Sequence, residues 1–288
     1  MFAIGGGESY FRINAADHDP EATENAAEQE YDMRWPTVIR ASSAAIMVMG
    51  LAGPAWGGGG TLELTGTIRD FKDGSKSGGH RDFEYSPANY GLRTGIVQST
   101  LGEDRKPVFN INYNRGNYGY AMITSKATFD QWFRNVDGVN LSDKHTITLT
   151  DADGDGIYTF EASIHNGQSF FPLDGKLFGN QGRNHNFHFT YEVHSKFTYS
   201  DPSGRQPMVF NFSGDDDVWV FINNKLVVDL GGVHSEVYSS IDVDNLAASL
   251  GLEPGKTYNF DFFFCERHTT QSNCTISTSI QFLSPLYD

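Results

Sequence analysis

The sequence has few cysteines, few basic residues and no long apolar run, and each shortage excludes a class of protein or site. Its 288 residues include two cysteines, so a metal site built from cysteines alone would be incomplete. Lys and Arg number 21 against 36 Asp and Glu, and the net charge of -15 argues against nucleic acid or an anionic membrane surface as a partner. The apolar stretch at residues 41–52 is too short to span a bilayer.

Catalytic motifs are absent as well. The sequence contains no G-x-S-x-G, no H-E-x-x-H and no P-loop, and no G-x-G-x-x-G stands at a strand–helix junction. Glycoside hydrolysis needs two carboxylates at a defined separation, and nothing in the sequence selects such a pair. We therefore expect that the protein is not an enzyme, with a glycoside hydrolase of unrecognised site as a remaining alternative.

Aromatic residues and glycine are abundant. Aromatic side chains make up 14% of the chain, and 31 glycines separate short runs of alternating Val, Ile, Thr, Phe and Tyr. This pattern is typical of many strands joined by tight turns. Short helices are indicated only in QWFRNV (residues 131–136), with a start near Phe129, and over residues 243–255. Since no repeat or linker divides residues 58–288, we predict one all-β domain there, an antiparallel β-sandwich with long loops.

Residues 187–199 show the alternation most clearly. Positions 187, 189, 191 and 193 are apolar, whereas positions 188, 190, 192 and 194 are polar. The pattern predicts a strand with one dry face and one solvated face. His188 and His194 lie on the polar face six residues apart, about 20 Å at the rise of a strand, so they cannot share one metal ion without other ligands.

Residues 33–57 have the features of a secretory signal peptide. Arg34 and Arg40 form a basic start, residues 41–52 are apolar, and residues 55–57 form a small-x-small cleavage site. Residues 1–32 are polar, acidic and unpatterned, unlike the start of any signal peptide. We predict that translation begins at Met33, that residues 1–32 are a disordered extension outside the translated product, and that the protein is secreted. The alternative is that residues 41–52 form a buried helix.

The two cysteines, Cys265 and Cys274, lie nine positions apart across a polar, turn-like insert. They could face each other on adjacent strands of a hairpin, and in an exported protein a disulfide is the expected state. Two free buried thiols are the alternative. The neighbouring Glu266 and Arg267 are predicted to form a buried ion pair that braces the same hairpin.

Three consecutive aspartates, Asp215 to Asp217, directly precede a run that should be buried, residues 218–222. Adjacent carboxylates repel each other, so a cation among them favours keeping all three ionised in one loop. Oxygen donors select a hard ion, and Ca²⁺ tolerates the irregular geometry of loop ligands better than Mg²⁺ does. The alternative is a solvated turn whose Asp side chains cap backbone amides.

A second acidic loop contains Asp151, Asp153 and Asp155 followed by Gly156, which matches the opening of a calcium-binding loop. The twelfth position, where that motif needs a carboxylate, is Ala162. We therefore predict a β-hairpin turn here, because Asp-Gly steps are strong hairpin signals. A weak calcium site is the alternative.

Several longer stretches resemble one known family. They are FNFSGDDDVWVFINNKLVVDLGGVHS (residues 210–235), LGLEPGKTYNFDFFFCERHTTQSN (residues 250–273) and an earlier GTIRDFKDG (residues 66–74). The chain from Thr61 to Phe282 resembles the fibro-slime family, whose core belongs to the PA14 β-sandwich group. The resemblance implies an extracellular, sugar-binding or surface-associated domain.

The same resemblance implies a particular site. In PA14-type adhesins that bind sugars, two consecutive aspartates joined by a cis peptide coordinate calcium, and the calcium holds vicinal sugar hydroxyls. The match places this pair on Asp215 and Asp216, with Asp217 where glycine is usual, and Asn273 in the position of an asparagine from a later loop. The implied metal ligands are therefore Asp215, Asp216, Asp217 and Asn273.

Two further residues are candidates for ligand contact. His234 follows a strand end near the acidic loop, and Tyr118 lies in a Gly/Asn-rich stretch where exposed tyrosines suit the faces of sugar rings. We predict a secreted, calcium-dependent module that binds extracellular glycans or acts in adhesion. The alternative is a structural protein of a matrix or slime layer that binds protein neighbours without sugar.

Overall fold

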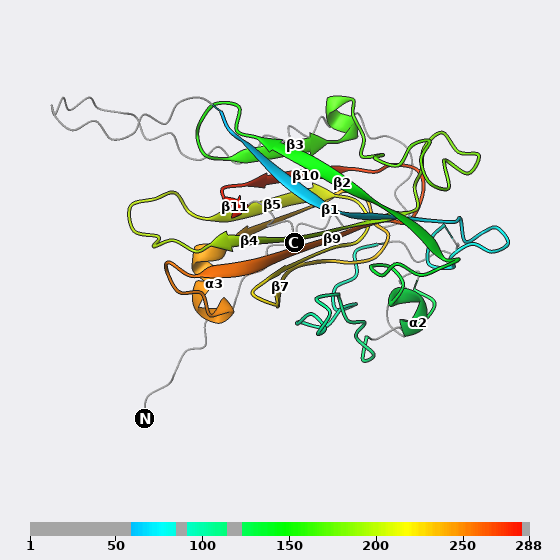
Figure 1. Cartoon of the computed structure of the whole chain (residues 1–288), viewed down its shortest axis with the longest axis horizontal. Coiled ribbons are helices and arrows are strands. Elements are labelled where there is room, and N and C mark those ends of the chain that lie inside the picture. The colour runs from blue at the N-terminus through cyan, green and yellow to red at the C-terminus, as the bar shows by residue number, and fades with distance from the viewer. Residues whose placement is uncertain (1–58, 85–90, 114–122, 284–288) are drawn as a thin grey trace, which may run out of the picture. The chain divides into compact units, whose positions relative to one another are not determined.

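Eleven strands dominate the computed structural model, which describes residues 59–84, 91–113 and 123–283 (Figure 1). All eleven belong to one sheet, in which each pair of neighbouring strands is antiparallel. The strands are β1 (Thr61–Phe71), β2 (Asn140–Thr150), β3 (Tyr158–Ala162), β4 (Phe189–Thr198), β5 (Val209–Gly214), β6 (Val218–Ile222), β7 (Lys225–Leu230), β8 (Val237–Asp242), β9 (Thr257–Glu266), β10 (Cys274–Thr278) and β11 (Phe282–Leu283).

The sheet bends over on itself to make the sandwich. Its strand order is β7-β6-β9-β4-β1-β2-β3-β10-β5-β8, with β11 on β4, and β2 meets β3 through the single pair Thr150 and Thr159. Phe210 and Phe212 of β5 contact Phe262 of β9 although these strands are not neighbours in the sheet. The two halves therefore pack face to face around one large apolar core. The prediction of an all-β sandwich is confirmed.

The strand that follows the three aspartates is buried on both faces. Val218, Val220 and Ile222 of β6 point into the core of the sandwich, whereas Trp219 and Phe221 belong to a second apolar cluster. Most residues of this second cluster come from residues 71–139, which include the short helix α2 (Lys126–Phe129). A layer of loops thus covers the outer face of β4, β6 and β9.

This covering layer corrects the prediction of a solvated face on β4. His188, Thr190 and Glu192 are buried, with at most 2% of each residue exposed. Their polar groups have partners instead of water: the Thr190 hydroxyl donates to the Trp132 carbonyl, and Arg69 donates to Glu192 at 2.7 Å. The face is polar, as the alternation predicted, but it is dry.

The predicted disulfide is also corrected, because Cys265 and Cys274 are free thiols. They lie on β9 and β10, which are not neighbours in the sheet. Cys265 packs in the second cluster and Cys274 in the core of the sandwich, so the two side chains lie on different sides of the sheet. A disulfide needs facing Cβ atoms, which this arrangement does not provide.

The helix predicted over residues 243–255 is present, whereas the one predicted to start near Phe129 is displaced, because the helix ends there and residues 131–133 form turns. The first helix, α2, ends at Phe129, and α3 (Val243–Leu250) begins at the N-cap Asp242 and ends at Gly251, whose φ is 72°. A single 3₁₀ turn, η1, spans Ile164–Asn166. None of the helices in the described ranges is long and apolar enough to cross a membrane. The predicted extension and signal peptide, residues 1–57, lie outside the described residues.

Candidate ligand pocket

A pocket of about 310 Å³ lies where β5, β7 and β9 end. Three loops line it: the one after β5, the one after β7 and the one between β9 and β10. Its lining residues are Asp215, Asp216, Val233, His234, Ser235, His268, Thr269, Thr270 and Gln271. The structure therefore brings two of the three predicted aspartates and the predicted His234 into one pocket.

Asp215 is held by the residue that was predicted to share its site. Its carboxylate accepts hydrogen bonds from the backbone N–H of Asn273 at 2.5 Å and from the Asn273 side-chain amide at 3.1 Å. The Asn273 side-chain oxygen in turn accepts from Ile164 N–H at 2.9 Å, so the amide group is fixed at both ends. Burial raises the pKa of Asp215 to about 6, although the bonds from Asn273 favour its ionised form.

Gly214 lets these two loops approach each other. A Cβ atom at this position would lie 2.6 Å from the Asn273 carbonyl oxygen, which is closer than any side-chain carbon can stand. The backbone contact that places Asn273 against Asp215 therefore depends on a glycine directly before the three aspartates.

Asp216 has a left-handed backbone, with φ of 59°. Asp tolerates this conformation better than most residues. No cis peptide bond occurs within the described ranges, so the Asp215–Asp216 bond is trans and differs from the pair that the resemblance implied. One Asp216 oxygen accepts from the backbone N–H groups of Arg267 at 2.7 Å and His268 at 3.2 Å. Burial and the charge of Asp215 raise the pKa of Asp216 well above its usual value.

Asp217 turns away from the pocket. Its two carboxylate oxygens accept from Arg267 Nε at 2.5 Å and from Gly232 N–H at 2.7 Å. The Arg267 guanidinium is fully buried and lies 4.6 Å from the ring centroid of Trp132. Arg267 thus pairs with Asp217, and the prediction that it pairs with Glu266 is wrong.

His234 lines the pocket, and one of its ring nitrogens is held by the backbone. Its Nδ1 lies 2.8 Å from the Ser235 carbonyl, to which only a protonated nitrogen can donate. Burial lowers the pKa of His234, which favours the neutral ring. Nε2 is buried and has no hydrogen-bond partner among the described residues.

Glu266 is a third buried acid beside the two aspartates, and the sequence did not indicate it as part of the site. It is 1% exposed, and one of its oxygens has no hydrogen-bond partner in the described part of the chain. Burial, and then the charges of Asp216 and Asp215, raise its pKa well above the usual value. The sequence feature that could have indicated Glu266 is its position, an acid directly after the buried apolar run of β9.

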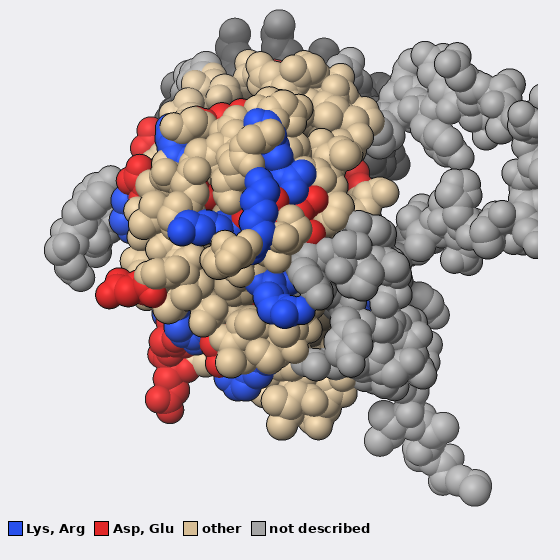
Figure 2. All heavy atoms as spheres, turned by 90° about the vertical axis from the view of Figure 1, so that its right-hand side faces the viewer, with Lys and Arg blue, Asp and Glu red and all other residues tan. Residues whose placement is uncertain are grey.

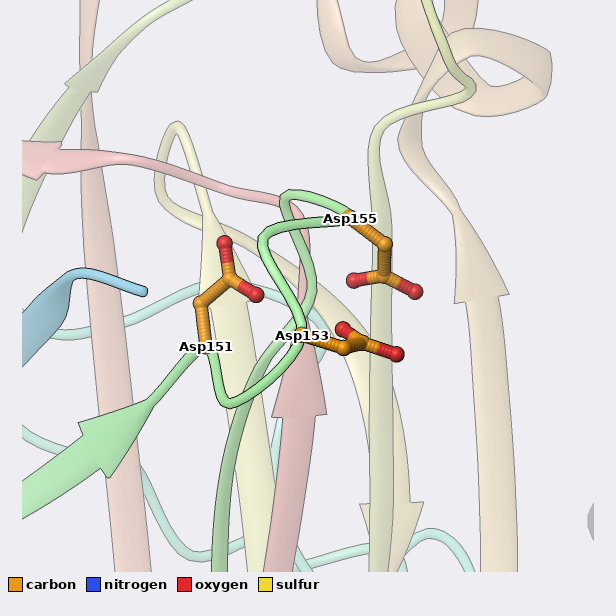
Figure 3. A group of neighbouring side chains, drawn as sticks. All are labelled: Asp151, Asp153 and Asp155. Atoms are coloured by element: carbon orange, nitrogen blue, oxygen red, sulfur yellow. The ribbon is translucent and has the colours of Figure 1, made fainter. Parts of the chain in front are cut away.

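The second acidic loop connects β2 and β3 as a hairpin, as predicted (Figure 3). Each of Asp151, Asp153 and Asp155 has an oxygen within 4.8 Å of an oxygen of the others. Within the described ranges, this loop is the one place where three His, Cys, Asp or Glu side chains bring possible metal-binding atoms within 4.8 Å of one another. Asp151 accepts from the N–H groups of Gly154 and Gly156, so its oxygens stabilise the turn. The predicted sugar contact Tyr118 lies outside the described residues.

Fold and pocket together define a class: an antiparallel β-sandwich with an acidic pocket at the ends of its strands. Residues 207–285, which contribute all of the residues that line the pocket, match the PA14 domain family. The PA14 domain of the MpAFP antifreeze protein is a solved structure with 10% identity and a TM-score of 0.24, over 42% of this chain and 63% of that chain.

Relatives with higher identity come from Dictyostelium discoideum. The protein psiR is 42% identical over 221 residues, which cover 72% of this chain and 20% of psiR. The protein psiC is 37% identical over 238 residues, which cover 79% of this chain and 43% of psiC. This chain therefore spans less than half of the length of either relative.

Proposed function

We propose that this protein is a glycan-binding or adhesion module that acts outside the cell and holds a calcium ion in the pocket. The observation that supports this proposal is the adjacent pair Asp215 and Asp216 on the pocket wall. In the described structure their carboxylates accept hydrogen bonds from amide groups and from no ammonium or guanidinium group. Two such buried charges favour a bound cation.

The donor set fits calcium. Asp215 and Asp216 would supply carboxylate oxygens, and backbone carbonyls of the pocket loops are hard donors of the kind that calcium accepts. Asn273 orients Asp215. Asp217 is left out of the proposed metal shell because it does not line the pocket and its charge is already paired with Arg267. A bound calcium ion would offset the two charges and coordinate vicinal hydroxyls of a sugar.

His234 would complete the contact with the sugar. His234, Thr270 and Gln271 line the same wall, where their polar groups would meet ligand hydroxyls. The match of residues 207–285 to the PA14 family supports the wider assignment to glycan binding or adhesion. The fibro-slime resemblance supports a place on the cell surface or in a secreted matrix.

The decisive variant is Asp215→Asn combined with Asp216→Asn, which keeps the shape of both side chains. We expect it to abolish calcium-dependent retention on a polysaccharide panel and to abolish the rise of melting temperature with calcium that the unaltered protein should show. The matched control, Asp153→Asn with Asp155→Asn, removes two charges from the exposed loop and should leave retention intact. Retention that survives both the pocket substitutions and a chelator would contradict the proposal.

A further inference from the structure

A strip of basic side chains near the pocket is a feature that the proposed function does not use. Residues 72–81 contain Lys72, Lys76 and Arg81 but only one acid, Asp73, in a chain where acids outnumber bases by 36 to 21. Figure 2 shows Lys and Arg side chains gathered in a stripe on one face, with Asp and Glu mostly along one margin. We call Lys72, Lys76 and Arg183 the basic strip, since Lys76 and Arg183 both contact Asp73, the residue next to Lys72.

The basic strip is held in place by contacts between two loops. Lys76 Nζ donates to the Gln181 carbonyl at 2.6 Å, and the Gln181 side-chain oxygen accepts from Asp73 N–H at 2.9 Å. Lys72 Nζ lies 4.9 Å from the ring centroid of Phe178. Because these contacts fix residues 72–76 against residues 178–183, a ligand meets basic groups that are already positioned.

The basic strip adjoins the pocket through one carboxylate. Arg183 Nη2 lies 3.3 Å from Glu84 Oε1, and Glu84 accepts from the backbone N–H of Thr269 at 3.1 Å and from its hydroxyl at 3.0 Å. Thr269 lines the pocket. A polymer with one unit in the pocket can therefore place its next units over the basic strip.

The charge of the basic strip is only partly neutralised. Asp73 is fully buried, and both Arg183 at 2.8 Å and Lys76 at 3.7 Å share it. Lys72 lies against the aromatic ring of Phe178, and 56% of the Lys76 side chain is exposed. At physiological ionic strength charges act over about 8 Å, so the basic strip attracts anions locally although the whole chain is acidic.

We infer that the basic strip extends the glycan site and selects acidic polysaccharides, which carry carboxylate or sulfate groups beside the unit in the pocket. This inference rests on the proposed function of the pocket. Arg183 is already paired with Asp73 and Glu84, so it positions the loop, and the two lysines supply the point charges that meet the carboxylate or sulfate groups. Longer polyanions such as nucleic acid are disfavoured, because beyond the basic strip they would meet a protein of net charge -15.

The test compares paired polysaccharides that share a backbone: dextran with carboxymethyl dextran, and agarose with a sulfated galactan. With calcium present, we expect the full chain to bind the acidic member roughly tenfold more tightly, since exposed ion pairs contribute about two- to fivefold each. The triple variant Lys72→Gln, Lys76→Gln and Arg183→Gln should remove this preference and leave the binding of the neutral polysaccharides unchanged. The control triple, Lys144→Gln, Lys196→Gln and Lys256→Gln, removes the same charge elsewhere and should keep the preference.

The outcomes separate the two proposals. The inference about the basic strip is overturned if the preference for acidic polysaccharides persists in the variant that replaces Lys72, Lys76 and Arg183. It is also overturned if a single-stranded DNA oligonucleotide displaces the acidic polysaccharide as well as free polysaccharide does. Failure of every polysaccharide to bind with calcium overturns the pocket function instead. Another outcome is that acidic polysaccharides bind through the basic strip without calcium and without Asp215. That result supports the role of the basic strip and contradicts the proposed function of the pocket. If the triple variant is poorly folded, Lys72→Gln with Lys76→Gln keeps the Arg183–Asp73 pair and must still lower the preference.

Discussion

At the scale of single residues, Arg267 supports the acidic loop from behind. It neutralises Asp217 and lies against Trp132, whose indole N–H donates to Asp82 at 3.0 Å. Its backbone N–H donates to Asp216 in the same loop. One buried cation therefore keeps Asp217 out of the pocket and helps to place Asp216 in it.

We expect Arg267→Met to destabilise the protein by about 3–5 kcal/mol, because Asp217 would remain as a buried charge without its partner. Chemical denaturation with wild-type protein as reference measures this change. Adding Asp217→Asn to the variant should recover a large part of the loss, since it removes the unpaired charge. A loss below 1 kcal/mol, or no recovery in the double variant, would show that the ion pair does not stabilise the loop.

Local sequence predicted some of these residues and misassigned others. Asp215 and Asp216 could be placed at a strand end because a buried run follows them directly. Glu266 was paired with Arg267 because the two are adjacent, but consecutive residues of an extended chain point to opposite sides. The real partner of Arg267 lies 50 positions away, and no local pattern indicates a contact over that separation.

At the scale of elements, alternation predicted the strands well and their exposure poorly. The alternation of apolar and polar residues in β4 predicts one apolar face and one polar face, and both parts of that prediction are correct. It does not report what covers the polar face. That information lies in residues 71–139, where Phe83, Phe129 and Trp132 sit in loops and a short helix and form a second core with no regular period.

The separation of β9 from β10 leads to a prediction about the cysteines. Since Cys265 and Cys274 lie on different sides of the sheet, reductant should leave the melting temperature unchanged, and unfolding without reductant should expose two titratable thiols. Thiol titration in denaturant with and without prior reduction measures this. Folded protein should react slowly, because both thiols are buried. A single oxidised pair, seen as thiols that appear only after reduction, would contradict the structure.

At the scale of the whole molecule, a buried ionic network fastens the loop layer to the sheet. His194 reaches Glu192 with Nε2 and Asp261 with Nδ1, both at 2.5 Å, so both ring nitrogens must carry protons. Arg105 and Lys106 of the loop layer donate to the same two carboxylates. The charge state of His194 therefore bears on how firmly residues 105–106 are held.

This network predicts how stability depends on pH. Burial disfavours the charged form of His194, but the bonds to Asp261 and Glu192 outweigh it and raise its pKa above 6.5. Burial likewise opposes ionisation of Glu192, yet the bond from His194 and the charge of Arg69 lower its pKa to about 2. The contribution of His194 to the free energy of unfolding is complete below pH 6.5 and is lost as pH rises through its pKa in the folded protein. The contribution of Glu192 is complete above pH 4.5 and is lost as pH falls towards 2.

The stabilisation from this network should therefore be greatest between pH 4.5 and 6.5. We expect His194→Gln to lower the melting temperature most in that window and less as pH rises above it, because neutral His194 donates only once. The Glu192 contribution, on the order of 3 kcal/mol from its lowered pKa, should disappear between pH 4 and 2. His165→Gln, which removes a more exposed histidine paired with Glu236, is the matched control and should leave the profile unchanged. Equal effects of the two substitutions at every pH would contradict the role of the network in joining the loop layer to the sheet.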